Sequence, residues 1–246
     1  QRQMCIRDRG TRYGEFYGYI AEGYFQSEEE IKKSPRQMRE LAPGDIKYKD
    51  LNDDGVIDAN DQCYLGKSWF PSWSYGMGFN INYHNFDLAL FFQGVSDVSI
   101  MANGGSIDTG NGDWGASGVG IVPFTGMGLN PSNVITKALD RWTADNPRAD
   151  AWYPRMTANA TTNDNNYVNS THWLKDGSYL RLKQASLGYT LENKKLMDKG
   201  IEYLYFYLSG QNLLTFSKFK LWDPELGSNG AKYPLSRMVT WGMRVS

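Results

Sequence analysis

Oxygen-bearing side chains recur at regular intervals between residues 50 and 61, and they specify the chemistry of this stretch. Asp50, Asn52 and Asp54 occupy the first, third and fifth positions of a loop of about twelve residues whose oxygens surround a calcium ion. A hard cation of this kind takes about six to eight oxygen ligands, which carboxylates, amides and main-chain carbonyls supply. The spacing therefore predicts a Ca²⁺ site.

The remaining positions of the loop fit the same chemistry. Gly55 stands at the sharp turn of the sixth position, and the apolar Ile57 is expected to attach the loop to its neighbours. Asp61 closes the loop with a shorter side chain than the usual glutamate, so it binds through one oxygen or draws the loop tighter. An Asn- and Asp-rich turn that binds no metal is the alternative. The predicted ligands are Asp50, Asn52, Asp54, the Val56 carbonyl, Asp58 (through water) and Asp61.

The segments on either side of the loop alternate between apolar and polar residues, at 44–49 and again from 62 onward. A calcium sensor works by moving two helices, and these flanks do not have a helical pattern. The loop is therefore expected to be a structural clip within a β-rich region. Bound calcium is expected to increase its resistance to proteolysis.

Alternation of bulky and small side chains is strongest in residues 73–83, where every odd position is apolar or aromatic and every even position is Ser, Gly or Asn. This pattern predicts a strand. The turn His84-Asn85 follows, and residues 86–93 return with the phase reversed, which predicts a hairpin. Further strands are expected at residues 179–189, 202–212 and 236–246.

The run at 179–189 changes phase within its length. Its apolar positions are even at Leu180 and Leu182 and odd from Ala185 onward. The change indicates either a β-bulge near Lys183-Gln184 or a membrane boundary at that point.

Composition excludes several classes of protein. The formal net charge of −1 over 246 residues provides no basic field, so no nucleic-acid partner is expected. The two cysteines are too few for a disulfide scaffold. Aromatic residues make up 14% of the chain and there are 26 glycines, a mixture that favours strands and tight turns over helical bundles.

The chain is not expected to be an enzyme. His84 stands in a tight turn and His172 in a loop, where a solvated histidine is more common than an acid–base catalyst. No nucleophile motif or phosphate-binding loop occurs in the sequence. Substrate-binding residues cannot be assigned individually. The loop tryptophans either stack on sugar rings or, more simply, pack against the loops themselves, and they are Trp114, Trp142, Trp152 and Trp173.

Two all-β folds accommodate these strands. A secreted, soluble β-sandwich module that binds glycans and carries a structural calcium shows the same alternation. Strands of about ten residues, aromatic side chains near the strand ends and a small or polar opposite face favour an antiparallel transmembrane β-barrel segment with long extracellular loops. In the barrel the bulky residues of 73–83 and 86–93 face outer-membrane lipid.

The expected organisation has three parts. Residues 1–10 contain Met4-Cys-Ile-Arg-Asp-Arg9, which resembles a translated sequencing adapter, and they are excluded from the fold. Residues 11–72 form an extracellular loop region that holds the calcium loop. Residues 73–246 form the carboxyl-terminal barrel strands, with a long loop at 95–177.

Connection lengths give an expected orientation. The short connections are 84–85 and about 191–201, and the long ones are the segment before 72, 95–177 and 216–235. Outer-membrane barrels keep short turns in the periplasm and long loops outside the cell. The calcium loop is therefore expected outside, and the carboxyl terminus in the periplasm.

Several motifs stand in a characteristic order along the chain. They are Pro43–Asp50 with the calcium loop, Phe91-Phe-Gln-Gly94, Arg141-Trp-Thr143 with Asn146-Pro147, Leu174–Lys183, Leu187-Gly-Tyr189, Ser209–Thr215 and Trp222-Asp-Pro-Glu225. From about residue 13 to the end, the chain resembles the carboxyl-terminal third of a SusC/RagA-type TonB-dependent outer-membrane transporter of Bacteroidetes.

The resemblance implies a barrel of about 22 strands, of which this chain supplies about five. It also implies a multi-pass location in the outer membrane, an interior plug and nutrient uptake driven by the TonB complex through the missing amino-terminal part. A SusD-like surface lipoprotein is the implied partner, and oligosaccharides or peptides are the implied substrates. The plug, the TonB-contacting segment and the usual final aromatic residue are absent from this sequence, so we interpret the chain as a fragment.

Overall fold

The computed structural model describes residues 12–103, 136–156, 164–198, 200–228, 233 and 235–246. Strands account for most of its regular structure, and the α-helices of this part are the short α2 (Glu28–Lys33) and α3 (Lys194–Met197). The all-β class expected from the alternating runs is confirmed. None of the helices in these ranges is long and apolar enough to cross a membrane.

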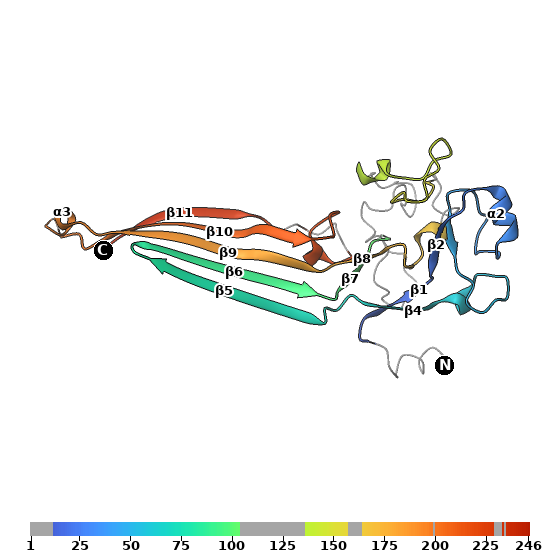
Figure 1. Cartoon of the computed structure of the whole chain (residues 1–246), viewed down its shortest axis with the longest axis horizontal. Helices are drawn as coiled ribbons and strands as arrows, with labels where there is room; N and C mark the ends of the chain where they lie inside the picture. Colours follow the sequence, from blue (N-terminus) through green and yellow to red (C-terminus); the bar gives the residue numbers. More distant parts are fainter. Residues whose placement is uncertain (1–11, 104–135, 157–163, 199, 229–232, 234) are drawn as a thin grey trace. The chain divides into compact units, whose positions relative to one another are not determined.

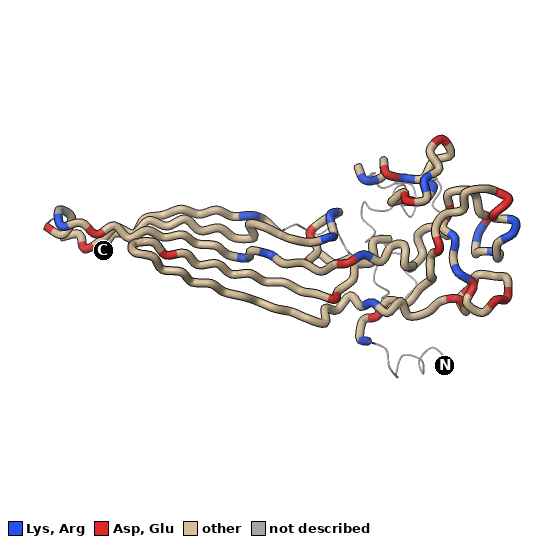
Figure 2. The backbone as a smooth tube through the Cα atoms, in the orientation of Figure 1, with Lys and Arg blue, Asp and Glu red and all other residues tan. Residues whose placement is uncertain are grey.

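The chain divides into two compact units. One unit comprises residues up to 70, 98–176 and 221–232, and the other comprises residues 71–97, 177–220 and 233–246. The long segment after residue 97 thus belongs with the amino-terminal region and not with the strands on either side of it. Figure 2 shows charged residues to be sparse along the strands of the second unit and frequent in the first.

The second unit is a five-stranded antiparallel sheet with the order β11-β10-β9-β6-β5 (Figure 1). Each alternating run of the sequence forms one of these strands. Their bounds are β5 (Trp73–Tyr83), β6 (Phe86–Ser96), β9 (Tyr179–Leu191), β10 (Leu204–Ser217) and β11 (Met238–Val245).

The register aligns the bulky residues of all five strands. Residues directly opposite each other in an antiparallel pair share a face of the sheet. Small and polar residues form the rows between the apolar ones. One apolar row is Ile81, Leu88, Leu187, Leu208 and Trp241, and the neighbouring polar row is Asn80, Ala89, Ser186, Ser209 and Thr240.

The bulge expected near Lys183 is confirmed. Phe91 pairs with Gln184, but the next residue, Phe92, pairs with Leu182, so the register skips Lys183. On its other side β9 pairs with β10, and this pairing also shifts: Gln211 pairs with Gln184 and Leu214 pairs with Leu182. A bulge adds one residue without reversing the faces of the sheet. The even apolar positions of β9 before the bulge therefore share a face with the odd ones after it.

Short and long connections leave the sheet at opposite ends. The turn between β5 and β6 and the link from residue 192 to 203 lie at one end. Residues 97–178 and 218–237 connect strands at the other end, where Trp73 begins β5.

The first unit is built from short two-stranded ladders. These are β1 (Glu15–Gly18) with β4 (Cys63–Ser68), β2 (Ala21–Tyr24) with β3 (Ile46–Tyr48), and β7 (Ser99–Met101) with β8 (Leu174–Asp176). In the described part of this unit they are accompanied by the short 3₁₀ segments η1 (Ala59–Asp61), η2 (Thr136–Leu139), η4 (Asp164–Tyr167) and η5 (Pro224–Leu226). Buried aromatic and aliphatic side chains, among them Trp173, Tyr153 and Ile46, form the core of this unit.

Candidate functional site

The predicted calcium loop lies between β3 and β4, and its first half folds around its own side chains. The Asp50 carboxylate accepts the Gly55 amide at 2.8 Å, which joins the first and sixth positions. Asn52 accepts the Asp54 amide at 3.1 Å, and Asp54 accepts the Val56 amide at 2.9 Å. These bonds tie the side chains of the first, third and fifth positions to main-chain amides of the loop itself, while Asn52 and Asp54 stay exposed.

Backbone conformation in this loop requires particular residues. Gly55 has φ of 81° and Asp53 has φ of 57°, both in the left-handed region. Glycine adopts this region without penalty, and aspartate and asparagine adopt it more readily than other residues. The turn at the sixth position expected from the sequence is therefore present.

Asp61 closes the loop through main-chain contacts. Its carboxylate is fully buried and accepts the Leu51 amide at 2.8 Å and the Asp58 amide at 2.8 Å. Burial raises the pKa of Asp61, but main-chain hydrogen bonds, from Asp58 and Leu51 among others, outweigh it and hold the pKa below its ordinary value. Asp61 is thus charged and ties the end of the loop to its start.

The acidic side chains of the loop do not converge on one point. In the parts of the chain that the structure describes, no group of three or more His, Cys, Asp or Glu residues is arranged to hold a metal ion. Asp58 is occupied as the amino-terminal cap of η1. The second carboxylate oxygen of Asp50, however, is a buried acceptor without a hydrogen-bond donor. A buried carboxylate oxygen without a donor is unfavourable unless another group compensates for its lost hydration. A bound cation would do so, which makes this orphaned oxygen a candidate ligand.

Ile57 attaches the loop to the rest of the unit, as its apolar character predicted. It is buried, and its amide donates to the Arg36 carbonyl at 2.8 Å, while the Arg36 amide donates to the Gly55 carbonyl at 3.0 Å. The adjacent Gln37 is also buried and donates to the Asn165 side chain at 3.1 Å. The loop is thereby connected to a segment more than a hundred residues away.

Sequence reasoning missed a buried ion pair in this unit. Arg155 donates two hydrogen bonds of 3.0 Å to the Asp45 carboxylate, and Asn166 donates a third, of 2.8 Å, to the same group. Asp45 is separated from Arg155 by 110 positions and from Asn166 by 121. No local pattern in the sequence can therefore identify this group.

The loop tryptophans pack into the first unit. Trp142 and Trp173 are buried, and Trp152 lies edge-on against Trp173 with ring centroids 5.5 Å apart. Self-packing therefore accounts for these three, while Trp114 lies outside the described residues.

The two histidines have different environments: His84 is exposed, as expected, whereas His172, which was expected to be solvated, is half-buried against the loop aromatics. His84 occupies the β5–β6 turn with φ of 51°. His172 contacts the Trp152 carbonyl at 3.2 Å and the Tyr24 hydroxyl at 3.3 Å. Burial, and secondarily the charge of Lys175, lowers the pKa of His172 from 6.5 to about 4.

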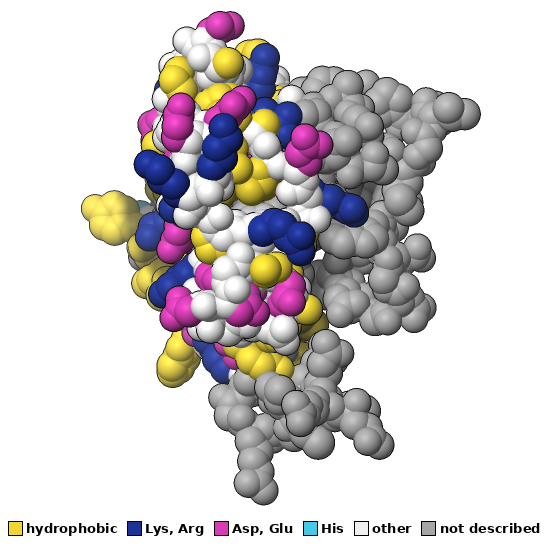
Figure 3. Space-filling view, turned by 90° about the vertical axis from the view of Figure 1, so that its right-hand side faces the viewer, with side chains coloured by type: hydrophobic (Ala, Val, Ile, Leu, Met, Phe, Trp, Pro, Cys, Tyr) yellow, Lys and Arg dark blue, Asp and Glu magenta, His cyan; other side chains and the backbone are white. Residues whose placement is uncertain are grey.

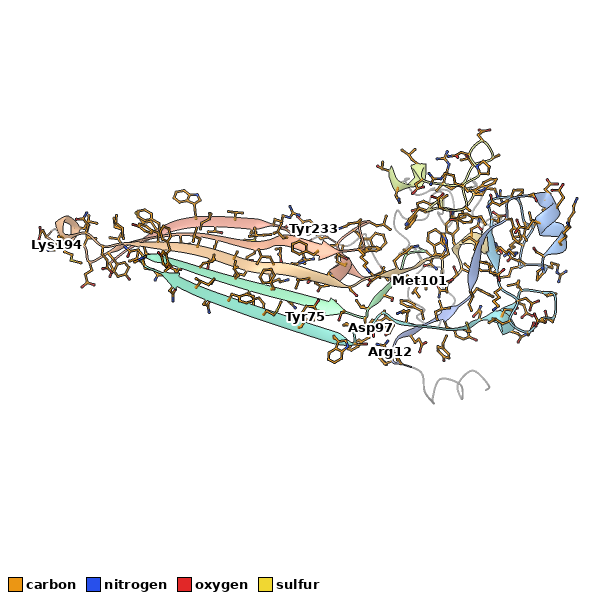
Figure 4. The ribbon with its side chains drawn as sticks, viewed as in Figure 1. Arg12, Tyr75, Asp97, Met101, Lys194 and Tyr233 are labelled. Carbon is orange, nitrogen blue, oxygen red and sulfur yellow. The ribbon has the colours of Figure 1, made fainter. Side chains whose placement is uncertain are left out.

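The apolar face of the sheet is the second functional feature. Trp241 is 82% exposed and Trp73 is 70% exposed, and Val239, Met243 and Ile81 are also exposed. Figure 4 shows side chains along the length of this sheet, with Tyr75 labelled on β5. No second sheet packs on these residues within the described part of the unit. In Figure 3, by contrast, acidic and basic side chains are interspersed over the visible face of the molecule.

The sheet carries bulky apolar side chains on one face and has long connections at one end, which places the chain in a class of antiparallel β-proteins. Comparison with known proteins identifies the class more closely. No protein-family model matches the sequence. The chain is 28% identical to TonB-dependent receptor P3 of Formosa agariphila over 261 residues, which cover 100% of this chain and 23% of that receptor. It is 29% identical to TonB-dependent receptor P26 of the same organism, covering 94% of this chain and 22% of that one.

Solved structures show the same fold. The RagAB peptide importer in its "open-open" state matches with a TM-score of 0.60 and 22% identity, over 94% of this chain and 22% of that chain. The structure of the RagAB peptide transporter matches equally well, with a TM-score of 0.60. The expected resemblance is thus confirmed as sequence similarity to TonB-dependent receptors and as a fold shared with the RagAB structures. It spans less than a quarter of the length of the curated relatives that it matches.

Proposed function

We propose that this chain forms part of the wall of a β-barrel of about 22 strands in the bacterial outer membrane. The protein that contains it imports nutrients with energy from the TonB complex. The observation that carries this proposal is the register of the sheet, which gathers the bulky residues of five strands on one continuous, exposed face. Such a face is stable against lipid hydrocarbon and costly in water.

The opposite face suits a water-filled lumen. Its rows contain glycine, serine, asparagine and threonine, together with charged residues such as Asp87 and Arg244. Asp87 accepts a hydrogen bond from the Tyr205 hydroxyl at 2.9 Å, and the Arg244 guanidinium lies 5.9 Å from the Tyr205 ring centroid. Polar interiors and apolar exteriors alternate along the strands of outer-membrane barrels.

Substrate and partners follow from the relatives. We assign oligosaccharides or peptides as the substrate class, and a SusD-like lipoprotein and the TonB complex as partners. The confirmed SusC/RagA-type resemblance supports this assignment, and the fold shared with a peptide importer is consistent with it.

We also propose that the loop at 50–61 binds Ca²⁺ as a structural ion. Support comes from the bond between Asp50 and Gly55, the hydrogen bonds of Asn52 and Asp54 to loop amides, and the Asp50 oxygen that has no hydrogen-bond donor. Bound calcium neutralises these charges and holds the loop on the strand-like contact at Arg36. Limited proteolysis of the full-length protein in membranes tests this: calcium slows cleavage at the loop, and equal rates with calcium and with chelator contradict it.

Membrane association tests the barrel directly. The full-length protein is expected in the outer-membrane fraction, to require detergent for extraction, and to migrate faster on gels when it is not heated. Recovery in the aqueous fraction, with membranes left empty and no heat-dependent shift, contradicts the proposal and favours a secreted glycan-binding sandwich.

A further inference from the structure

Two tyrosines of β10 lie on the polar face of the sheet, against glycines of the neighbouring strands. Tyr207 pairs directly with Gly188 on β9 and with Gly242 on β11. A Cβ atom on Gly242 would lie 2.5 Å from the Tyr207 hydroxyl oxygen, and 2.6 Å and 2.8 Å from two adjacent ring carbons. Such similar distances place the face of the ring, and not its edge, over the glycine. The Tyr207 ring therefore lies flat against the main chain of β11.

The second tyrosine, Tyr205, reaches over β9 to the strand beyond it. Its hydroxyl donates to the Asp87 carboxylate of β6 at 2.9 Å, and a Cβ atom on Gly188 would collide with both groups. The rings of Tyr205 and Tyr207 are nearly parallel, at 23°, with centroids 6.1 Å apart. Alternate residues of a strand are about 7 Å apart along its length, so these rings lie side by side. We call the two rings the tyrosine platform.

Polar groups flank the tyrosine platform. The Asp87 carboxylate lies at the Tyr205 hydroxyl, and Arg244 of β11 pairs with Tyr205, its guanidinium 5.9 Å from the ring centroid. A carboxylate accepts hydrogen bonds and a guanidinium donates them. Arg244 is exposed and both tyrosines are half-buried, so a ligand on this face can reach the rings and the guanidinium. Because the two charges balance, the platform suits a neutral ligand.

We propose that the tyrosine platform binds a neutral sugar ring inside the barrel lumen, an inference that rests on the proposed barrel. One face of a sugar ring consists of C–H groups that pack on an aromatic ring, and the hydroxyls at its rim need hydrogen-bond donors and acceptors. Small-molecule sites combine aromatic walls with a few placed polar groups in this way. A peptide main chain instead presents polar amides at every residue. The platform therefore selects oligosaccharides from the two proposed substrate classes.

Binding of labelled sugars to the full-length protein in detergent tests the platform. The probes are fluorescent hexasaccharides of glucose, galactose, mannose and xylose, and fluorescent hexapeptides without charged side chains serve for comparison. Tyr207→Ala removes one ring and is expected to weaken sugar binding by roughly tenfold or more. Tyr207→Phe keeps the ring and should retain most of the binding. The heat-dependent gel shift verifies that each variant folds.

Two glycine variants move the ring without removing it. Gly242→Ala places a methyl group where the Tyr207 ring lies, so it should displace the ring and weaken sugar binding. Gly78→Ala adds the same methyl group to the polar face of β5, where its nearest neighbour lies at 3.9 Å, and should leave binding unchanged. This pair decides the question if Tyr207→Ala does not assemble.

The inference is wrong if none of the sugars binds the wild type, or if Tyr207→Ala or Gly242→Ala binds them as tightly as Gly78→Ala does. Peptide binding that is lost in Tyr207→Ala, without sugar binding, would assign the platform to peptides and also contradict it. In each of these cases a normal heat-dependent shift of the wild type leaves the barrel standing. A wild type without that shift contradicts the barrel proposal itself.

Discussion

Phe92 of β6 pairs with Leu182 of β9, although the residue before it, Phe91, pairs with Gln184. This step in the register is the reason that one apolar face extends over the whole length of the sheet. Without the extra residue, Lys183, the side chains of Tyr179–Leu182 would exchange faces. Arg181 would then point to the apolar side.

Deletion of Lys183 is therefore expected to impair assembly. The deletion moves Arg181 to the apolar face and turns Leu180 and Leu182 toward the polar face, so neither face matches its surroundings at this end of the strands. The folded, fast-migrating band on unheated gels should decrease strongly. Lys183→Ala keeps the extra residue and serves as the control, for which normal assembly is expected. Equal amounts of folded protein for the deletion and the control would show that the bulge is dispensable.

Arg155→Met is expected to destabilise the first unit by about 1.5–3 kcal/mol, because it removes two hydrogen bonds from the buried Asp45 side chain. Arg148→Met is the matched control. Arg148 pairs with Asp140 at the surface, where such a pair contributes about 1 kcal/mol or less. Hydrogen exchange of peptides from the first unit, followed during a urea titration, compares the two variants, and similar losses would contradict the importance of the buried pair.

Stability of the first unit should fall in mild acid because of His172. Its pKa of about 4 in the folded protein lies below its ordinary 6.5, so the unfolded chain takes up a proton first. The contribution is present above about pH 6.5 and is lost as the pH falls toward about 4, by up to about 3 kcal/mol.

The same exchange experiment at about pH 7 and about pH 5 measures this loss. His172→Gln should reduce the difference between the two conditions, while His84→Gln, in the β5–β6 turn, should leave it unchanged. If the His172→Gln variant shows the same loss of stability between the two pH values, groups other than His172 cause that loss.

Protection of the 50–61 loop from protease by calcium should depend on which aspartate of the loop is replaced. Asp50→Asn removes a negative charge at the first ligand position and is expected to abolish most of the protection from protease. Asp53→Asn removes the same charge at the fourth position, which supplies no ligand, and asparagine tolerates its φ of 57°. Protection that is lost equally in both variants would indicate a general effect of charge.

Much of the sheet was predictable because alternation is a local signal. The run at 73–83 has the bounds of β5 without correction. The run at 202–212 was predicted too short, since β10 extends to Ser217. Asn212 has φ of 53°, and such a residue ordinarily ends a strand. Here it belongs to the irregularity opposite Lys183, and the strand continues beyond it.

The interior of the first unit was not predictable in the same way. Asp45 and Asn166 look like ordinary polar loop residues in the sequence, and only the folded chain brings them to 2.8 Å. The cluster of exposed rings formed by Tyr13, Trp69 and Phe70 was also missed. Tyr13 and Phe70 are separated by the whole calcium-loop region, and the Ser68 hydroxyl that joins them resembles any surface serine in sequence.

Spin labels placed one at a time along residues 76–82 of β5, in the full-length protein in vesicles, test the central claim most directly. The account predicts that collision with oxygen, which concentrates in lipid, peaks at Met77, Phe79 and Ile81 and falls at the positions between them. Labels at those three positions that neither oxygen nor a water-soluble nickel reagent reaches would contradict it, because the side chains would then be buried in a dry protein interior.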